Sequence, residues 1–260
     1  MQPDRPRVDG RVKPGHDEDA AARDEDAAAR DEDGEDGVAY NTAAATAHMS
    51  TLPARSLTEP ESLRLLREFG VPVVETLECD NFDAARNAAD RVSWPVVLKG
   101  VAEGVAHKSE LGLVRTNLRD ADALQSAYKA FGTRRVIVQP MVPGALEAIA
   151  GISRSPGVGL VLLCGLGGIH AEALRDVCLW PVPVSPDAIA DKLARSSLGR
   201  VLRSPRWQHP DSLRALMHLL VALQDFAVSL GDRLEAVDIN PVMLGAAGAI
   251  AVDALVVPRA

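Results

Sequence analysis

The sequence has few of the features that mark exported or membrane-spanning proteins. Its three cysteines, Cys79, Cys164 and Cys178, lie far apart, form no Cys-x-x-Cys pair and are odd in number, which indicates a reducing compartment rather than a disulfide framework. The longest nearly uninterrupted apolar run, residues 158–169, is too short to cross a bilayer. The N-terminus is charged where a signal peptide needs an apolar stretch. We therefore expect a cytoplasmic protein that does not enter a membrane.

An excess of positive charge is also missing. The net charge is −8, but residues 1–37 hold 13 Asp and Glu against 6 Lys and Arg, so residues 38–260 carry only −1. A nearly neutral body has no basic field to hold a nucleic-acid backbone. The sequence therefore predicts no nucleic-acid partner, and any anion site must be local.

Residues 1–55 differ in composition from the rest of the chain. The unit Ala-Ala-Arg-Asp-Glu-Asp-Ala at 21–27 is almost repeated at 28–34, and such a segment has too few large apolar side chains to offset its ordering entropy. We expect a disordered acidic extension, which is either an interaction tail or a solvated segment without a role. Met49 is a candidate for the true start, because the globular pattern begins just after it.

Hydrophobic periodicity and turn residues predict an α+β domain over residues 56–257, with helices that cover mostly antiparallel, neighbouring strands. Helices are expected at 58–69, 80–92 with Asp80 as the cap, 120–131, from 185 onward, and 210–230. Strands are expected at 71–76, 95–99, 113–117, 136–141, 146–153 and 159–163, with a final hairpin of 234–244 and 249–256.

The final hairpin carries polar side chains among apolar ones. In Val-Asp-Ile-Asn, strand alternation places Asp238 and Asn240 on the same face, and Asp253 lies in an otherwise apolar strand. Carboxylate and amide oxygens on adjacent strands are the ligands that Mg²⁺ prefers. The alternative is that these polar groups lie at strand ends and form hydrogen bonds within the adjacent turns.

Two segments offer basic groups to an anion. Lys99 ends a buried strand, where its ammonium group is costly to desolvate unless a phosphate meets it or its amine reaches water. The loop of residues 104–112 contains His107 and Lys108 between glycines. This loop is either an exposed connection or a cover for phosphates, in which His107 could accept a phosphoryl group.

A strand followed by Pro143-Gly144 separates Gln139 from Glu147. This segment is either a plain strand and turn or a hinge between two lobes. In a hinge, the backbone edge would contact adenine, and Glu147 would take a ribose hydroxyl.

The glycine cluster 165–168 does not form a dinucleotide-binding loop. His170 stands where the third glycine is required, and no βαβ unit precedes it. The cluster is either a purely structural turn or a tight turn near phosphates, with Glu172 directed toward a metal or the transferred group.

Five segments in this order resemble one family. They are Pro-Val-Val-Leu-Lys, His-Lys-Ser-Glu-Leu-Gly-Leu-Val, Val-Gln-Pro-Met-Val-Pro-Gly-Ala-Leu-Glu, Gly-Leu-Gly-Gly-Ile, and Asp-Ile-Asn-Pro-Val with a later Val-Asp-Ala. Over about residues 57–257 they are similar to the ATP-grasp portion of NDP-forming acyl-CoA synthetases, which itself is similar to the nucleotide-binding subunit of succinate-CoA ligases. The resemblance implies an ATP-grasp fold, in which two α/β lobes hold a nucleotide between them.

The resemblance also implies the roles of individual residues. The residues that bind ATP or ADP would be Lys99, Lys108, Gln139, Met141 and Glu147. Lys99 and Lys108 would hold the phosphates, Gln139 would lie in the adenine hinge, and Glu147 would bind ribose. The Mg²⁺ ligands would be Asn240 and Asp253, with Asp238 close behind. The catalytic residues would be His107 as a phosphoryl relay, Lys108 and Glu172, with positioning and charge neutralisation providing most of the catalysis.

Two departures from the family pattern stand out. The sequence reads Glu-Leu-Gly-Leu at 110–113 where the family usually has a Gly-Gly pair, and the family's CoA-binding and ligase portions are absent from this chain. The implied protein is the ATP-binding subunit of a hetero-oligomeric synthetase that catalyses acid + CoA + ATP ⇌ acyl-CoA + ADP + phosphate. Its partner subunit would supply CoA, a small carboxylic acid and a phosphohistidine. The rival is a non-catalytic nucleotide-binding or regulatory module that has lost this partner.

Overall fold

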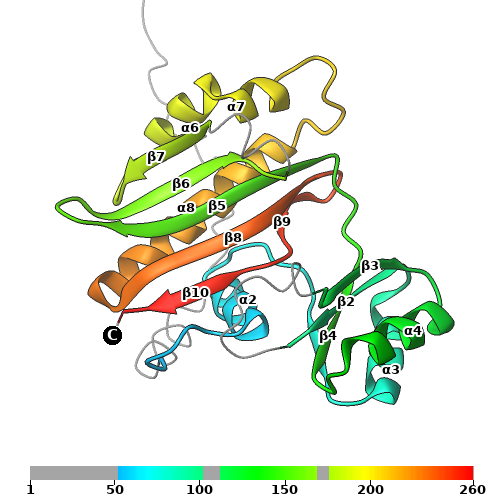
Figure 1. Ribbon diagram of the computed structural model, residues 1–260. Helices are drawn as coiled ribbons and strands as arrows, with labels where there is room; N and C mark the ends of the chain where they lie inside the picture. The colour runs from blue at the N-terminus through cyan, green and yellow to red at the C-terminus, as the bar shows by residue number, and fades with distance from the viewer. Residues whose placement is uncertain (1–51, 102–111, 169–175, 260) are drawn as a thin grey trace, which may run out of the picture. The chain divides into compact units, whose positions relative to one another are not determined.

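Two antiparallel sheets organise the chain in the computed structural model (Figure 1), which describes residues 52–101, 112–168 and 176–259. All described residues belong to one unit, residues 39–260. The predicted acidic extension therefore lies almost wholly outside the described residues, as do His107, Lys108 and Glu172.

The smaller sheet has four strands in the order β1-β4-β2-β3. They are β1 (Leu77–Cys79), β4 (Val136–Pro140), β2 (Val96–Gly100) and β3 (Val114–Leu118). Helices α3 (Phe82–Val92) and α4 (Ala121–Phe131) share one buried core with this sheet, in which Leu98, Leu124 and Val138 are fully buried. Both helices begin at a side-chain cap and bury an alanine- or leucine-containing face, as their sequence period requires.

The larger sheet has six strands, of which five follow the order β10-β8-β5-β6-β7, while β9 pairs with β8. The strands are β5 (Leu146–Ser155), β6 (Gly159–Leu166), β7 (Val177–Pro181), β8 (Leu234–Gly245), β9 (Gly248–Ala251) and β10 (Leu255–Pro258). Helices α6 (Pro186–Arg195), α7 (Ser197–Leu202) and α8 (Ser212–Leu230), followed by the short η1 (Gly231–Arg233), pack on this sheet. These sheets and helices confirm the predicted α+β class.

Helix α8 is long and apolar enough to cross a membrane, with a mean hydropathy of 1.4 in its most apolar window, yet 50% of that window is buried inside the protein. It runs along one face of the larger sheet (Figure 1), where Leu216, Leu220 and Leu223 have no exposed surface. The apolar composition of α8 is therefore explained by its place in the core of the larger sheet.

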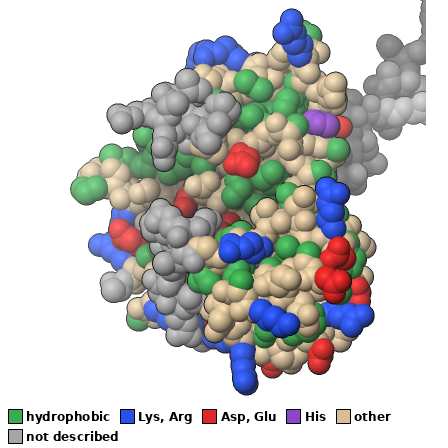
Figure 2. Space-filling model, turned by 45° about the vertical axis from the view of Figure 1, so that its right-hand side comes forward, with side chains coloured by type: hydrophobic (Ala, Val, Ile, Leu, Met, Phe, Trp, Pro, Cys, Tyr) green, Lys and Arg blue, Asp and Glu red, His purple; other side chains and the backbone are tan. Residues whose placement is uncertain are grey.

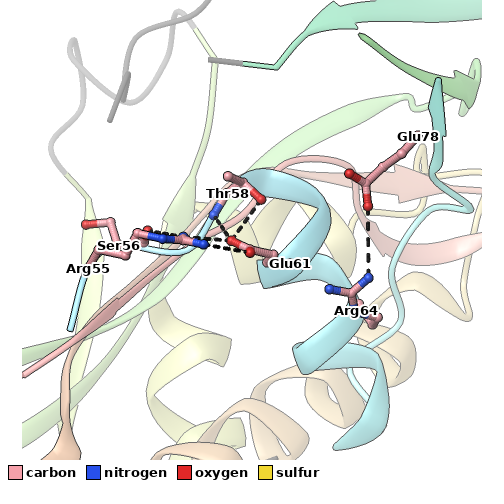
Figure 3. A network of polar contacts seen from close by, with 6 residues as sticks. All are labelled: Arg55, Ser56, Thr58, Glu61, Arg64 and Glu78. Atoms are coloured by element: carbon pink, nitrogen blue, oxygen red, sulfur yellow. Dashed lines mark hydrogen bonds and ion pairs between the residues drawn. The ribbon is translucent and has the colours of Figure 1, made fainter. Parts of the chain in front are cut away.

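Helix α2 (Glu59–Glu68) is fixed at its start by a polar network (Figure 3). The Thr58 backbone N–H and hydroxyl donate to Glu61 Oε2 at 2.7 and 3.0 Å, as in a capping box. The Arg55 guanidinium donates to the same carboxylate at 2.8 Å and lowers the pKa of Glu61 to about 2. Arg64 reaches Glu78 at 3.9 Å. Glu59 is the first residue of the helix that this network caps.

The predicted strand 71–76 is wrong. Residues there make one parallel bridge, Val73 with Ala251, and the regular strand β1 comes later. Val71 and Val74 bury their side chains in the core of the larger sheet. Apolar periodicity detects this burial but cannot tell whether the segment pairs with another strand. Pro72 disfavours such pairing because it has no N–H.

Two smaller predictions are also wrong. Asn81, rather than Asp80, caps α3, since its side chain accepts a hydrogen bond from the Ala84 N–H at 2.8 Å. The second strand of the final hairpin is interrupted, because β9 ends before Asp253 and β10 begins after it. Asp253 therefore lies in a connection between two strands that both pair with β8.

Charges are mixed on the face that Figure 2 shows. Lys and Arg side chains stand among Asp and Glu side chains there instead of gathering into one patch. On this face, a strong anion site would have to be built from a few local groups.

Candidate functional site

Residues of both sheets line one cavity of about 210 Å³. Six residues predicted from the sequence are in its lining, namely Lys99, Gln139, Met141, Glu147, Asn240 and Asp253. The rest of the lining is mostly apolar and comprises Val97, Val114, Thr116, Pro140, Val142, Pro241, Met243 and Val252. An apolar cavity with a few convergent polar groups is the usual form of a small-molecule site.

Lys99 is almost fully buried, with 5% of its surface exposed. Its Nζ lies 2.7 Å from Glu59 Oε1, 2.8 Å from the Val252 carbonyl oxygen and 3.7 Å from Asp253 Oδ2. The sequence left two alternatives for Lys99, an anion that meets its amine or an amine that reaches water, and the burial of Lys99 shows that the second is wrong. A carboxylate of the protein itself meets the ammonium group, at the edge of the cavity.

Glu59 is a buried charged residue beside the site that the sequence analysis missed. It is 3% exposed and does not line the cavity but lies behind Lys99. A signal was present, since Glu59 precedes the buried Leu63 by four residues and Leu66 by seven, and therefore lies on the apolar face of α2. A carboxylate on such a face requires a partner.

Gln139 is also buried, at 1% exposure. Its Nε2 donates to Glu59 Oε1 at 3.1 Å and to Thr76 Oγ1 at 3.0 Å. The chain then leaves β4 at Met141, which is 37% exposed and whose N–H donates to the Pro95 carbonyl at 2.9 Å. Because β4 and β5 belong to different sheets, the segment between Gln139 and Glu147 connects the two sheets, as a hinge would.

Glu147, at the end of the hinge segment, contacts the glycine cluster 165–168. The Gly167 N–H donates to the Glu147 carbonyl at 2.9 Å. A β-carbon added at Gly168, whose φ is +60°, would lie 2.8 Å from Glu147 Oε2. Glycine at 168 suits the positive φ of this turn and leaves room for the Glu147 carboxylate, so the turn lies beside a residue of the cavity lining.

Asn240 reaches the cavity because β8 is irregular. The register between β5 and β8 shifts between Ala148 and Ala150, and both Asn240 and Pro241 then line the cavity. Such a bulge redirects side chains next to a site. Asp253 enters from the β9–β10 connection, with 37% of its side chain exposed.

The donor set of the cavity fits Mg²⁺. The amide oxygen of Asn240 and the carboxylate of Asp253 are hard oxygen ligands, and Mg²⁺ usually takes one or two such ligands and completes its shell with phosphate and water. Among the described residues, no group of three or more His, Cys, Asp and Glu could hold a metal alone. Asp238 is exposed and is not in the described lining of the cavity, so its place near the metal stays a prediction.

Leu113, where the sequence departs from the family pattern, has a packing explanation. A β-carbon added at Gly100 would lie 3.2 Å from Leu113 Cδ2, so the leucine side chain covers Gly100 on β2. Leu113 is not part of the cavity lining that the structure describes. Leu113 therefore packs against the core of the smaller sheet.

Residues 49–257 match the profile of a family described as the ATP-grasp domain, and the chain belongs to this family. It is 29% identical over 211 residues to the beta subunit of ADP-forming acetate–CoA ligase I of Pyrococcus furiosus, which covers 77% of this chain and 90% of that subunit. It is 30% identical over 203 residues to ADP-forming acetate–CoA ligase I of Archaeoglobus fulgidus, which covers 74% of this chain but 30% of that enzyme.

The fold is also similar to solved structures of acetyl-coenzyme A synthetase 1 from Ca. Korarchaeum cryptofilum. A complex with coenzyme A and Ca-AMPCP gives a TM-score of 0.74 at 28% identity, covering 79% of this chain and 94% of that one. A complex with coenzyme A and Mg-AMPPCP, whose phosphohistidine segment points toward the nucleotide-binding site, gives 0.70 at 29% identity, covering 79% and 93%. These relatives confirm the family that the five sequence segments indicated.

Proposed function

We propose that this chain is the ATP-binding subunit of an ADP-forming acyl-CoA synthetase and transfers a phosphoryl group between ATP or ADP and a histidine. The observation that supports this most is the convergence of Lys99, Glu147, Asn240 and Asp253 on one cavity between two sheets. The beta-subunit relatives, similar over most of their length, favour the same function.

Each residue would have a separate task in this reaction. Glu147 would accept hydrogen bonds from the ribose hydroxyls, and the backbone near Met141 would contact the base. Lys99 would hold a phosphate from one side, and Asn240 and Asp253 would hold Mg²⁺ on the other. The metal, when bound, neutralises charge on the phosphate oxygens. The buried position of Lys99 would keep its charge effective by excluding water.

The histidine chemistry would involve a second subunit. We propose that His107 relays the phosphoryl group, with Lys108 and Glu172 as further catalytic residues, and that a partner supplies CoA, the carboxylic acid and a phosphohistidine. The Pyrococcus furiosus relative is itself a beta subunit, which supports the proposal of a hetero-oligomer. We also propose that the enzyme is cytoplasmic, in keeping with its three widely spaced cysteines.

Phosphoryl transfer from γ-labelled ATP tests the proposed function. The protein with Mg-ATP should label a histidine of a candidate partner subunit encoded beside it, and the label should be stable to base and lost in acid. His107→Ala should abolish this labelling, whereas His209→Ala, a control near Trp207 and outside the cavity lining, should keep it. Nucleotide binding without any transfer of label would favour the non-catalytic module.

Replacement of Gly168 by alanine should weaken ADP binding about tenfold, because the new β-carbon would displace the Glu147 carboxylate and remove charged hydrogen bonds to ribose. Gly157→Ala is a matched control, since its φ of +77° carries similar backbone strain but nothing lies within 4 Å of its added β-carbon. Calorimetric titration of both variants compares their affinities. Equal affinities would contradict a fixed place for the Glu147 carboxylate beside Gly168 in the nucleotide complex.

A further inference from the structure

Two cysteines on neighbouring strands of the larger sheet have no part in the proposed function. Cys164 on β6 is directly opposite Cys178 on β7, and both are free thiols. We infer that they form a redox modification site, at which a peroxide joins them in a reversible disulfide that fixes β7 to β6. This inference does not depend on the nucleotide site or on a partner subunit.

Both thiols lie in the core of the larger sheet. Residues directly opposite one another in antiparallel strands present their side chains on the same face, with β-carbons about 4.5–5.5 Å apart. Cys164 is fully buried and Cys178 is 4% exposed, and both belong to the same core cluster. Cys79 is buried in the separate core of the smaller sheet. It therefore cannot compete for either thiol of the pair.

The hydrogen bonds between β6 and β7 determine how far apart the two backbones lie. The Val182 N–H donates to the Leu160 carbonyl at 2.9 Å, and these residues are four positions from Cys178 and Cys164. Hydrogen-bonded pairs recur at every second residue of antiparallel strands, so the cysteines are also such a pair, with α-carbons about 5.5 Å apart. Most disulfides join cysteines at about 5.5–6 Å. The backbone of the sheet can therefore accept a disulfide here.

A disulfide at this position is strained enough to be reversible. Its β-carbons must come within about 3.5–4.5 Å of each other, which is closer than opposed residues in a sheet normally lie. The two strands are already close beside the pair, because a β-carbon added at Gly165 would lie 2.8 Å from the Asp176 carbonyl oxygen. Strained disulfides are reduced more easily than relaxed ones. The pair should therefore be dithiol under reducing conditions and disulfide under oxidising ones.

The position of β7 gives a small oxidant a route to the thiols. Among the described strands, β7 pairs with β6 alone and forms an edge of the larger sheet (Figure 1). Local opening of an edge strand costs less free energy than global unfolding. Burial raises the pKa of both thiols, so little thiolate is present at neutral pH and oxidation is slow. We therefore expect a response to sustained rather than brief exposure to peroxide.

The oxidation needs one peroxide molecule for each disulfide. The thiolate of Cys178, the less buried of the two, attacks a peroxide oxygen; the O–O bond breaks, and a sulfenic acid and water form. The sulfur of Cys164 then attacks the Cys178 sulfur, so that the S–S bond forms, the S–O bond breaks and a second water leaves. The two thiols lose two electrons and two hydrogen atoms, and hydrogen peroxide is reduced to two waters.

Disulfide mapping of the full-length protein tests the inference. Folded protein is treated with hydrogen peroxide, the remaining thiols are alkylated in denaturant, and the peptides are identified by mass spectrometry. We expect a disulfide between Cys164 and Cys178, whereas Cys79 should form none. Excess reduced glutathione should restore both thiols. Peroxide-treated protein in which both cysteines are still alkylated, or in which Cys178 reaches sulfinic acid without a disulfide, would overturn the inference.

Alanine variants of the three cysteines are the controls. Cys79→Ala should form the same disulfide as the wild type, whereas Cys164→Ala should form none. If Cys164→Ala does not fold, Cys178→Ala serves the same purpose at a slightly more exposed position. A disulfide that forms only after urea is added belongs to the unfolded chain and would count against a site built by the fold.

Hydrogen–deuterium exchange tests whether the disulfide fixes β7. The peptide that contains Val177–Pro181 should exchange its amide hydrogens more slowly in peroxide-treated wild type than in untreated protein, because the crosslink opposes local opening of the edge strand. In Cys164→Ala, peroxide should leave this rate unchanged. An unchanged rate in wild-type protein that carries the mapped disulfide would contradict the fixing of β7.

Discussion

Replacement of Lys99 by methionine should reduce Mg-ATP affinity by about 100-fold, close to the upper range for losing one charged hydrogen bond in a buried site. It should also destabilise the fold by about 3–5 kcal/mol, because Glu59, whose side chain is 2% exposed, would keep a buried charge without Lys99. Urea denaturation and calorimetric titration measure the two effects separately.

Two further variants make this prediction specific. Lys129→Met, on the exposed face of α4, should change stability by less than about 0.5 kcal/mol and leave the affinity unchanged. Adding Glu59→Gln to Lys99→Met should restore part of the stability, since the buried charge that has lost Lys99 is removed, but none of the affinity. A Lys99→Met protein that binds Mg-ATP as tightly as the wild type would show that the phosphates lie elsewhere.

Replacement of Asp253 by alanine should raise the Mg²⁺ concentration needed for half-saturation of ATP binding by about 100-fold. The reason is that Asp253 is the only carboxylate near the Lys99 amine that also lines the described cavity with Asn240, and even residues behind the metal ligands change metal affinity by about 10–100-fold. The side chain is 37% exposed, so the fold should tolerate the change. Mg²⁺ titrations at fixed ATP measure the shift.

Asp238 and Glu235 provide the comparison for Asp253. Both are exposed on β8, and Glu235→Gln should leave the Mg²⁺ requirement unchanged. Asp238→Asn should raise it by about tenfold if Asp238 stands behind the metal ligands, as the family resemblance implies. If Asp253→Ala keeps the wild-type Mg²⁺ requirement, the metal site must be placed elsewhere.

Polar residues that break an apolar strand pattern were the part of the site that sequence alone could identify. Lys99, Asn240 and Asp253 each interrupt a run of apolar residues, and such positions are costly unless a partner or ligand is present. All three line the same cavity. The sequence could indicate that each had a partner, but the identity of the partner required the fold.

Glu59 shows what sequence could not provide. Its contact with Lys99 joins residues 40 positions apart in the chain and depends on how α2 sits between the two sheets. The same limit explains the wrong strand at 71–76, because Val71 and Val74 are buried by tertiary packing without regular pairing. The choice between Asp80 and Asn81 as a cap is a local error of one residue, where both side chains can accept the same hydrogen bond.

A crystal structure with Mg²⁺ and a non-hydrolysable ATP analogue is the most direct test of the central claim. We expect the cation at the Asn240 amide and the Asp253 carboxylate, a phosphate beside the Lys99 amine, and the ribose at Glu147. An analogue bound away from this cavity, or a cation held by neither Asn240 nor Asp253, would contradict the account.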